Sequence, residues 1–416
     1  MNFLWSFTNA FLRPLLSDRR GNAAIIFALV LVPILGLVGA TIDYGRSYNA
    51  KNHLQAAVDT AALTGSTGEF ENENLRLDAV NTAFNANFDT NAYGISVTPA
   101  VSFDDTITTV SASATVSTMV MGVMSIDDMY VAVNATAIRE EGGPICLLAL
   151  NPTMEKAIDV IGGATLDAIT CAIHANSSHN NAIHSLGSTS TTADSICAVG
   201  GVVGTGYTPQ PDEGCYKVKD PYENLVPPLT GGCDHTGMKL KKGSFTLSPG
   251  IYCDGLQLEN EAIVTLLPGT YVIKDGGLVF GTKSVASGHG VSFYFTGDDT
   301  FLSISAIAAV DLSAPTAGPY DGLVFIQDPT SNPGQPLGKT NLINGSGALN
   351  IVGSIYLPTQ GLQITGGGHF GAAAPLLTII VDHLELSATM TLRDDIVAAG
   401  MSPKVPKTYD GARLTN

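Results

Sequence analysis

Six cysteines are the residues of this sequence with the widest choice of chemistry. They are Cys146, Cys171, Cys197, Cys215, Cys233 and Cys253. In a reducing compartment, cysteines in such numbers indicate a metal site or catalysis, whereas in an exported protein an even number indicates disulfides. No Cys-x-x-Cys pair occurs. The compartment that the chain occupies therefore decides between these interpretations.

Histidines and acidic residues supply a weak signal for glycoside hydrolysis. Gly288-His289-Gly290 and Asp298-Asp299 are superficially similar to polygalacturonase motifs. That reaction needs two carboxyl groups about 5 to 10 Å apart across the scissile bond. The motif order is reversed here, the Asn-Thr-Asp motif is missing and no Arg-x-Lys follows. We therefore predict that the protein is not an enzyme, with a carbohydrate-active β-helix enzyme as the alternative.

Metal and phosphate sites are predicted to be absent. His174, His179 and His184 are spaced five apart, but no carboxylate or thiol stands at ligand spacing, so surface histidines on turns are expected. Asp311-Leu312-Ser313-Ala314-Pro315 lacks the second serine of a metal-binding Asp-x-Ser-x-Ser motif. Residues 334–340 resemble a phosphate loop with one residue too few between the glycines. No cofactor is expected.

Composition excludes several classes of function. The net charge of −17 opposes binding to nucleic acid and to anionic lipid head groups. Only 14% of the residues are charged and 45% are apolar, which argues against disorder. The 45 glycines are typical of many short strands joined by turns.

The N-terminal region contains a candidate membrane anchor. Ala23–Ile42 is a run of twenty uncharged residues, and a helix of that length crosses a hydrocarbon core of about 30 Å. Arg13, Arg19 and Arg20 precede it, so residues 1–20 are predicted to be cytoplasmic and the rest exported. The cysteines would then lie in an oxidising compartment.

A cleaved signal peptide is the alternative, since Val38-Gly39-Ala40 offers small residues at a cleavage site. The apolar run is longer than a usual signal core, and the helical pattern continues to Leu63, which favours an anchor. Pro33 is expected to kink this helix, as membrane helices tolerate.

The same region resembles a known family. Arg19–Ala24, the apolar span, Asp43–Arg46 and Leu54–Leu63 together resemble the TadE/TadG-like family, pilin-like proteins of the tight-adherence (Flp) pilus machinery. The resemblance implies a single-pass protein of a bacterial inner membrane that assists pilus assembly and surface attachment. Ile26 stands where members cleaved by prepilin peptidase carry Glu, so Gly21 is not expected to be a cleavage site. The TadG-like branch, here without a von Willebrand A domain, fits better.

The resemblance also implies partners. These are other Tad pilus-assembly proteins or pseudopilins, together with the lipid bilayer around residues 23–42; a surface carbohydrate is a further candidate. Pilin-type proteins associate through their N-terminal helices, so partner packing is expected along the stretch from Asp43 to Leu63 of the predicted helix at 21–63. The candidate residues are Asp43, Tyr44, Arg46, Leu54, Ala57, Val58 and Ala61. The same apolar stripe would equally suit packing on the chain's own sheet.

Residues 64–140 have the pattern of a small pilin-like α+β segment. We predict a helix at Glu71–Phe88 and strands at 95–103, 106–116 and 130–138, with a hairpin turn at Asp104-Asp105. The apolar segment Met119–Ile126 is predicted to be a short core helix; a partner surface made by its methionines is the alternative.

Residues 144–400 repeat loosely every twenty residues or so. Ala157–Asn176 aligns with Ala182–Gly201, and Ser248–Tyr252 is echoed by Leu267–Tyr271. Short strands at this spacing predict a right-handed parallel β-helix, in which stacked coils share one core; a β-sandwich is the alternative. The chain is therefore predicted to be α+β and mainly β, with a C-terminal tail at 401–416.

Proline-rich residues 200–242 are predicted to leave the solenoid as an irregular excursion pinned by disulfides. Six cysteines allow fifteen connectivities. Pairing of neighbours, Cys146 with Cys171, Cys197 with Cys215 and Cys233 with Cys253, is the connectivity we expect.

The predicted function is structural, as a membrane-anchored component of a Tad-type pilus system acting in biogenesis or adhesion. A carbohydrate-active enzyme would show clustered acidic residues with raised pKa values. A carbohydrate-binding adhesin would show stacked, exposed Tyr and Phe along one face.

Overall fold

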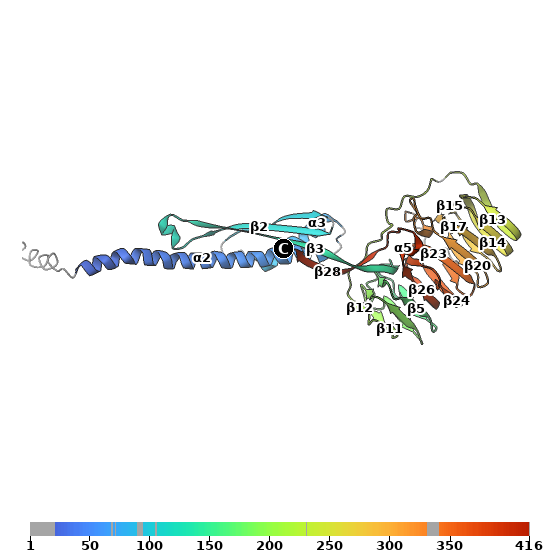
Figure 1. Cartoon of the computed structure of the whole chain (residues 1–416), viewed down its shortest axis with the longest axis horizontal. Helices are drawn as coiled ribbons and strands as arrows, with labels where there is room; N and C mark the ends of the chain where they lie inside the picture. Colours follow the sequence, from blue (N-terminus) through green and yellow to red (C-terminus); the bar gives the residue numbers. More distant parts are fainter. Residues whose placement is uncertain are drawn as a thin grey trace, which may run out of the picture. The chain divides into compact units, whose positions relative to one another are not determined.

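The computed structural model describes residues 21–67, 70, 72–89, 95–104, 106–229, 231–330 and 341–415 (Figure 1). The predicted cytoplasmic segment 1–20, Asp105 of the predicted turn and the loop at 334–340 lie outside these residues. The chain forms two compact units. The first comprises Met1–Glu140 and Gly411–Asn416, and the second comprises Glu141–Asp410. Each is described by itself.

Helices form one side of the first unit. Helix α2, Gly21–Thr67, runs for 47 residues and contains Pro33. It joins the predicted apolar span and its polar continuation in a single helix. Helix α3, Glu73–Asn87, begins after Asn72, whose side chain accepts a hydrogen bond from the Leu75 backbone N–H at 3.0 Å. An Asn at this position satisfies an amide that has no partner within the helix.

An antiparallel sheet forms the other side, and its described pairings join three strands. Its strands are β1 (Ala100–Asp104), β2 (Ile107–Ser117) and the first part of β3 (Asp128–Ala149). Alternate residues of β2 are buried, as the period of a half-buried strand requires. Val110 and Val116 lie on that buried face with Leu54 of α2 and Phe84 of α3.

The second unit is built from short strands. Before residue 214 they are β4 (Ile158–Ile161), β5 (Thr165–Ala168), β6 (Ala172–Ala175), β7 (Ile183–Leu186), β8 (Ser190–Ala193), β9 (Ile196–Ala198), β10 (Val202–Val203), β11 (Tyr207–Thr208) and β12 (Asp212–Glu213). From residue 235 they are β13 (His235–Leu247), β14 (Gly250–Leu266), β15 (Gly269–Lys274), β16 (Gly277–Phe280), β17 (Val285–His289), β18 (Val291–Thr296), β19 (Phe301–Ile304) and β20 (Ala309–Ser313). The last are β21 (Leu323–Gln327), β22 (Asn341–Asn344), β23 (Ala348–Leu357), β24 (Leu362–Phe370), β25 (Leu376–Val381), β26 (Leu384–Thr391) and β27 (Arg393–Asp394), followed by the short helix α5 (Ile396–Ala399). Strand β28 (Lys407–Thr415) then runs from the second unit into the first.

These strands stack in parallel, which confirms the predicted β-helix-like solenoid over the β-sandwich. Strands β4, β5 and β6 pair with β7, β8 and β9, so each coil contributes three strands. The register advances by one coil at each step, as in Ile158 opposite Ile183. A sandwich would pair its strands antiparallel, whereas only β25 with β27 does so among the described pairings of this unit.

The spatial order of the coils differs from their order in the chain. The first coil stacks on the last, with Ile379 opposite Leu147, Leu384 opposite Ile158 and Met390 opposite Leu166. The chain therefore enters the solenoid in its middle and winds outward to β12. It then resumes at β13, at the far end, and winds back to the middle. Figure 1 shows red β26 between orange β24 and green β5, with β12 and β13 at opposite ends.

One continuous apolar core fills the coils. An aromatic stack runs along part of it, with ring centroids of Tyr252 and Tyr271 5.8 Å apart, Tyr271 and Phe293 5.4 Å apart, and Phe293 and Phe325 5.7 Å apart. Equivalent positions of successive parallel strands face the same interior, so similar side chains stack on one another.

A strap, residues 214–229 and 231–234, connects the two ends of the solenoid. The predicted excursion at 200–242 is wrong in its bounds, because β10 to β12 still form part of a coil and β13 begins at His235. Val218 and Tyr222 of the strap pack on outward-facing Tyr294, Tyr356 and Ile380. Proline-rich sequence breaks the strand pattern here, but the strap's apolar residues cover the sheet.

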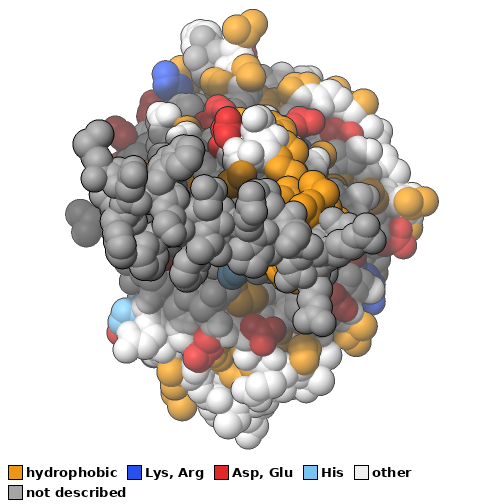
Figure 2. Space-filling view, turned by 90° about the vertical axis from the view of Figure 1, so that its left-hand side faces the viewer, with side chains coloured by type: hydrophobic (Ala, Val, Ile, Leu, Met, Phe, Trp, Pro, Cys, Tyr) orange, Lys and Arg blue, Asp and Glu red, His pale blue; other side chains and the backbone are white. Residues whose placement is uncertain are grey.

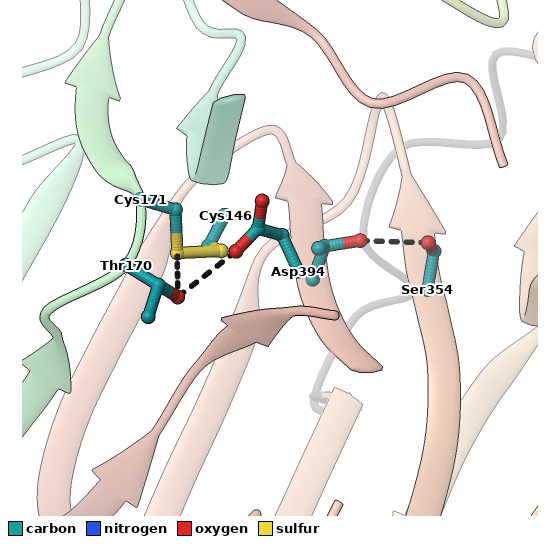
Figure 3. Close-up of a disulfide and its surroundings, with 6 residues drawn as sticks. Cys146, Thr170, Cys171, Ser354 and Asp394 are labelled. Carbon is teal, nitrogen blue, oxygen red and sulfur yellow. Dashed lines mark hydrogen bonds between the residues drawn. A yellow bond between two sulfur atoms is a disulfide. The ribbon is translucent and has the colours of Figure 1, made fainter. Parts of the chain in front are cut away.

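The second unit contains three disulfides. They are Cys146–Cys171, Cys197–Cys215 and Cys233–Cys253, the pairs expected from the sequence. Cys146–Cys171 joins β3 to the start of β6, whereas the last two tie the beginning and the end of the strap to β9 and β14, which pair with the end strands β12 and β13. Beside the first, Thr170 donates a hydrogen bond to the Asp394 carboxylate at 2.9 Å (Figure 3). Sequence separations of 25, 18 and 20 residues match one coil.

The contact between the last and the first coils makes a prediction. Leu386 of β26 is wholly buried between β24 and β4. Leu386→Ala should lower the free energy of unfolding by about 2–5 kcal/mol, the usual cost of such a cavity. Urea denaturation of the full chain in detergent measures it. Leu186→Ala, at a side chain 62% exposed, is the control and should change little. Equal effects would contradict this coil order.

Candidate functional site: the N-terminal helix and its docked hairpin

Helix α2 divides into two halves. In the first, residues 25–42, most side chains are exposed, and we call it the bare half. In the second, residues 43–67, many side chains are buried, and we call it the packed half. Phe27, Leu29 and Leu37 are 67–71% exposed, although they are large and apolar. Leu54 and Val58, in contrast, are wholly buried. The bare half is long and apolar enough to cross a membrane. Figure 2 shows a patch of hydrophobic side chains beside the atoms drawn in grey.

The predicted partner residues separate into two groups. Leu54, Ala57, Val58 and Ala61 lie in the core between α2, α3 and the sheet, so they are not available to a partner helix. Their stripe packs on the chain's own sheet, in one apolar cluster with buried residues of β2 and β3. Tyr44 is 63% exposed and stacks on Tyr48, with ring centroids 6.4 Å apart. Arg46 is partly exposed.

Asp43 holds a hairpin to the helix. It is the first residue after the apolar span, and its carboxylate is buried. It accepts hydrogen bonds from the backbone N–H groups of Met119, Val120 and Met121 at 2.9, 2.9 and 2.7 Å. These amides belong to the connection between β2 and β3, which we call the hairpin tip, residues 118–126. A carboxylate bonded by three amides is a strong, directional anchor for a loop.

Glycines let the hairpin tip approach α2. A Cβ atom at Gly39 would collide with the side chain of Val120, and one at Gly36 would touch Met124 Cε at 3.4 Å. Small residues on a helix face allow another segment to pack closely. Asp43, Gly39 and Gly36 lie at spacings of four and three, so they share one face of α2.

The hairpin tip is not the core helix predicted from the sequence. It contains a single 3₁₀ turn, η1 (Met121–Met124), and none of its residues is buried. Met119 is 69% exposed and Val123 is 87% exposed. The prediction is wrong because this loop packs along the surface of α2 at Gly36, Gly39 and Asp43 and does not enter the core. The sequence pattern does not indicate that Asp43 is a hydrogen-bond acceptor for this loop, because its backbone partners lie 76 to 78 residues away along the chain.

The other end of α2 is fastened by polar contacts. Ser66 donates to the carbonyl of Ala137 at 3.0 Å. Arg76 of α3 donates to the carbonyl of Gly65 at 2.8 Å, and its guanidinium lies 4.4 Å from the ring centroid of Phe103. Helix, hairpin and sheet are thus joined at both ends of the packed half.

The histidines of the second unit have structural surroundings. His174 and His184 are buried, so the expectation of surface histidines is wrong for both. Burial lowers the pKa of His174 to about 4, because the charged ring would lose its hydration. His184 Nδ1 lies 2.7 Å from the carboxylate of Asp159. Among the described residues, the one cluster with metal-ligand geometry is Cys146, Cys171 and Asp394, and its two sulfurs form a disulfide.

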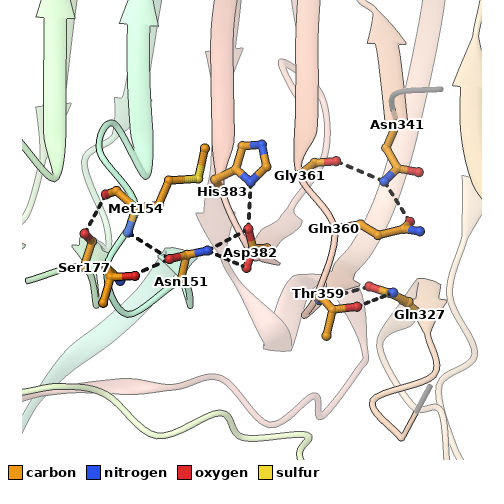
Figure 4. Close-up of polar contacts among 11 residues, drawn as sticks. Asn151, Met154, Ser177, Gln327, Asn341, Thr359, Gln360, Gly361, Asp382 and His383 are labelled. Atoms are coloured by element: carbon orange, nitrogen blue, oxygen red, sulfur yellow. Dashed lines mark hydrogen bonds and ion pairs between the residues drawn. The ribbon is translucent and has the colours of Figure 1, made fainter. Parts of the chain in front are cut away.

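Polar side chains at the turns of the solenoid bond to one another (Figure 4). Asn341 donates to Gln360 at 3.0 Å, Gln327 to Thr359 at 2.6 Å, and Asn151 to Asp382 at 3.0 Å. Each bond links side chains of neighbouring coils. These groups are therefore engaged in holding turns together.

The residues of the weak polygalacturonase resemblance fall on the surface. His289 ends β17, and its Nδ1 lies 3.1 Å from Ser313 Oγ. Asp298 and Asp299 are exposed in the turn between β18 and β19. Asp311 lies within β20, as expected for a strand-turn repeat.

Comparison with known proteins identifies the N-terminal segment. Residues 21–67, which form α2, match the family described as "Putative Flp pilus-assembly TadE/G-like". This confirms the resemblance over those residues. No curated protein and no solved structure matches the chain.

The Asp43 contacts predict the effect of removing the carboxylate. Asp43→Ala should leave three backbone amides of the hairpin tip without acceptors, so that they exchange with solvent faster. Hydrogen exchange of the full chain in detergent micelles measures this at Met119–Met121. Asp128→Ala is the control, since Asp128 is exposed and accepts a hydrogen bond from the hydroxyl of nearby Ser117 rather than from the hairpin tip. Unchanged exchange in Asp43→Ala would contradict the anchor.

The glycine contacts predict opposite results for two similar substitutions. Gly→Ala in a helix usually stabilises by roughly 0.5–1 kcal/mol. Gly45→Ala should follow this rule, since nothing lies within 4 Å of its new Cβ. Gly39→Ala should instead displace Val120 and open the hairpin tip to proteolysis. Limited proteolysis of the two variants side by side tests this, and equal cleavage would rule out the close approach.

Proposed function

We propose that this chain, with its TadE/G-like helix, is a membrane-anchored structural component of a Tad-type pilus system, acting in pilus biogenesis. The division of α2 carries the proposal. The segment matched to the pilus-assembly family is half bare and half packed, which suits a helix that leaves a bilayer and continues into a folded unit. A soluble helix would not leave so long an apolar surface uncovered.

The proposed location is a bacterial inner membrane, with the N-terminus cytoplasmic and the second unit in the periplasm. Arg13, Arg19 and Arg20 before the span support that orientation. Three disulfides in the second unit support it independently, since disulfides persist in oxidising compartments.

The proposed role is not enzymatic. Among the described carboxyl groups, the one with a raised pKa is Asp220, a strap residue, because its burial disfavours the charged carboxylate. It accepts a hydrogen bond from the Tyr356 hydroxyl at 2.8 Å. A catalytic acid would sit among other acidic groups in a cleft, so this arrangement supports a structural part for Asp220.

Assembly is favoured over carbohydrate adhesion. The aromatic stack of the solenoid, from Tyr252 to Phe325, is buried in the core rather than displayed on a face. Sugar recognition by stacking needs exposed rings. The proposed partners are other pilus-assembly proteins or pseudopilins. The apolar stripe of α2 around Leu54 and Val58 is already buried in the first unit. We therefore propose that the exposed Tyr44 and Tyr48 contact these partners.

Complementation of a deletion strain tests this function. Deletion should reduce surface pili and attachment, and the wild-type chain should restore both. Tyr44→Ala with Tyr48→Ala should restore them poorly while the protein still fractionates with the membrane. Tyr216→Ala, a half-exposed tyrosine of the second unit, is the control and should restore them fully. Normal pili in the deletion strain would refute the assembly role.

A further inference from the structure

We propose that the hairpin tip, residues 118–126, is a second membrane-contacting element, which enters the periplasmic leaflet of the bilayer beside α2. This inference rests on the anchoring of α2 in the proposed function, and extends it to a segment outside the matched residues 21–67. The occupant of the exposed apolar face of the tip is then lipid.

Position along α2 is the first argument. Val120 packs against Gly39, and Met124 lies beside Gly36. Gly36 precedes Asp43 by seven residues, which corresponds to about 10 Å along a helix. Both glycines belong to the uncharged span Ala23–Ile42, which fills a hydrocarbon core of about 30 Å. A loop packed beside residues 36–39 must share their depth.

Side-chain chemistry is the second argument. The nine residues of the hairpin tip carry no charge. Met119, Val123, Met124 and Ile126 are 44–87% exposed, although each is apolar. In water this surface would be costly, whereas burial in lipid stabilises it by roughly 25 cal/mol for each Å² removed from water. The exposed face of the hairpin tip adjoins the bare half of α2, which the proposed function places in lipid. The same lipid would therefore cover the tip.

Backbone bonding is the third argument. Non-helical backbone is tolerated at membrane depth only where its polar groups have partners. The N–H groups of Met119, Val120 and Met121 bond to Asp43. The N–H groups of Val123, Ser125 and Ile126 bond to carbonyls of Val120, Gly122 and Met121. The hairpin tip therefore presents apolar side chains while these six amides have hydrogen-bond partners within the protein.

Exposed acids limit the depth of entry. Asp127 and Asp128 follow the hairpin tip directly and are exposed. A charged side chain at the bilayer centre costs at least about 2.5 kcal/mol. The acids therefore stay at the head groups, and the insertion is confined to one leaflet.

An environment-sensitive fluorophore tests the proposal. The six native cysteines are all paired in disulfides, so Val123→Cys introduces a single thiol for NBD labelling of the full chain. In liposomes of neutral phosphatidylcholine, the label should emit at shorter wavelength, and doxyl-labelled lipids should quench it several-fold. Val123 is 87% exposed, so its replacement should not disturb folding.

Two further positions separate the possible failures. Val397→Cys is the matched control, a valine of the second unit with the same 87% exposure, and should be neither shifted nor quenched. Leu29→Cys, in the bare half of α2, reports the anchor itself and should be quenched. An unquenched label at 29 would overturn the anchoring in the proposed function.

Quenching at 29 without quenching at 123 would overturn the hairpin inference alone. A shorter emission wavelength at 123 that doxyl lipids leave unquenched would identify a protein contact, and would equally refute lipid as the occupant. Quenching at both 29 and 123, with none at 397, is the expected result.

Discussion

The packing of residues 50–62 of α2 on β2 and β3 is the constraint on which the first unit depends. Leu54 and Val58, with alanines around them, bring the helix axis close to the sheet. The hairpin must then run alongside the helix, and Asp43 meets its backbone where the apolar span ends. The same helix that sets this register also continues into the bare half. The position of the hairpin tip along α2 is therefore set by packing at the opposite end of the helix.

Much of this architecture can be predicted from local pattern. The uncharged run Ala23–Ile42, the continuation to Leu63 and the alternation in β2 each contain their own signal. The β-helix follows from a repeat near twenty residues, and the same period favours disulfides between neighbouring cysteines. These features depend on residues close in sequence, which is why the sequence alone indicates them.

Other features depend on contacts between distant residues. The repeat predicts that Ile158 pairs with a residue one coil later, which is Ile183. Its partner on the other side is Leu384, far along the chain. The sequence does not indicate that pairing, because every coil has similar apolar strands. The amides bound by Asp43 leave no trace in side-chain pattern. His174 was expected on the surface, because nothing local shows that the strap approaches its strand. The apolar stripe of α2 that contains Leu54 and Val58 has a pattern that fits packing on a partner helix and packing on the chain's own sheet equally well, so the sequence does not decide between them.

The placement of the chain's entry and exit gives the solenoid a mechanical property. The chain enters the second unit at Glu141 and leaves it at Asp410, and Ile145 donates to the carbonyl of Pro406 at 2.7 Å, so both strands join the middle of the coil stack. A tensile load transmitted through these strands reaches interior coils, each held by neighbours on both sides. The outermost coils, which are the easiest to peel, lie outside the line of force and are stapled by Cys197–Cys215 and Cys233–Cys253. A solenoid attached in this way resists unravelling from its ends when it is pulled.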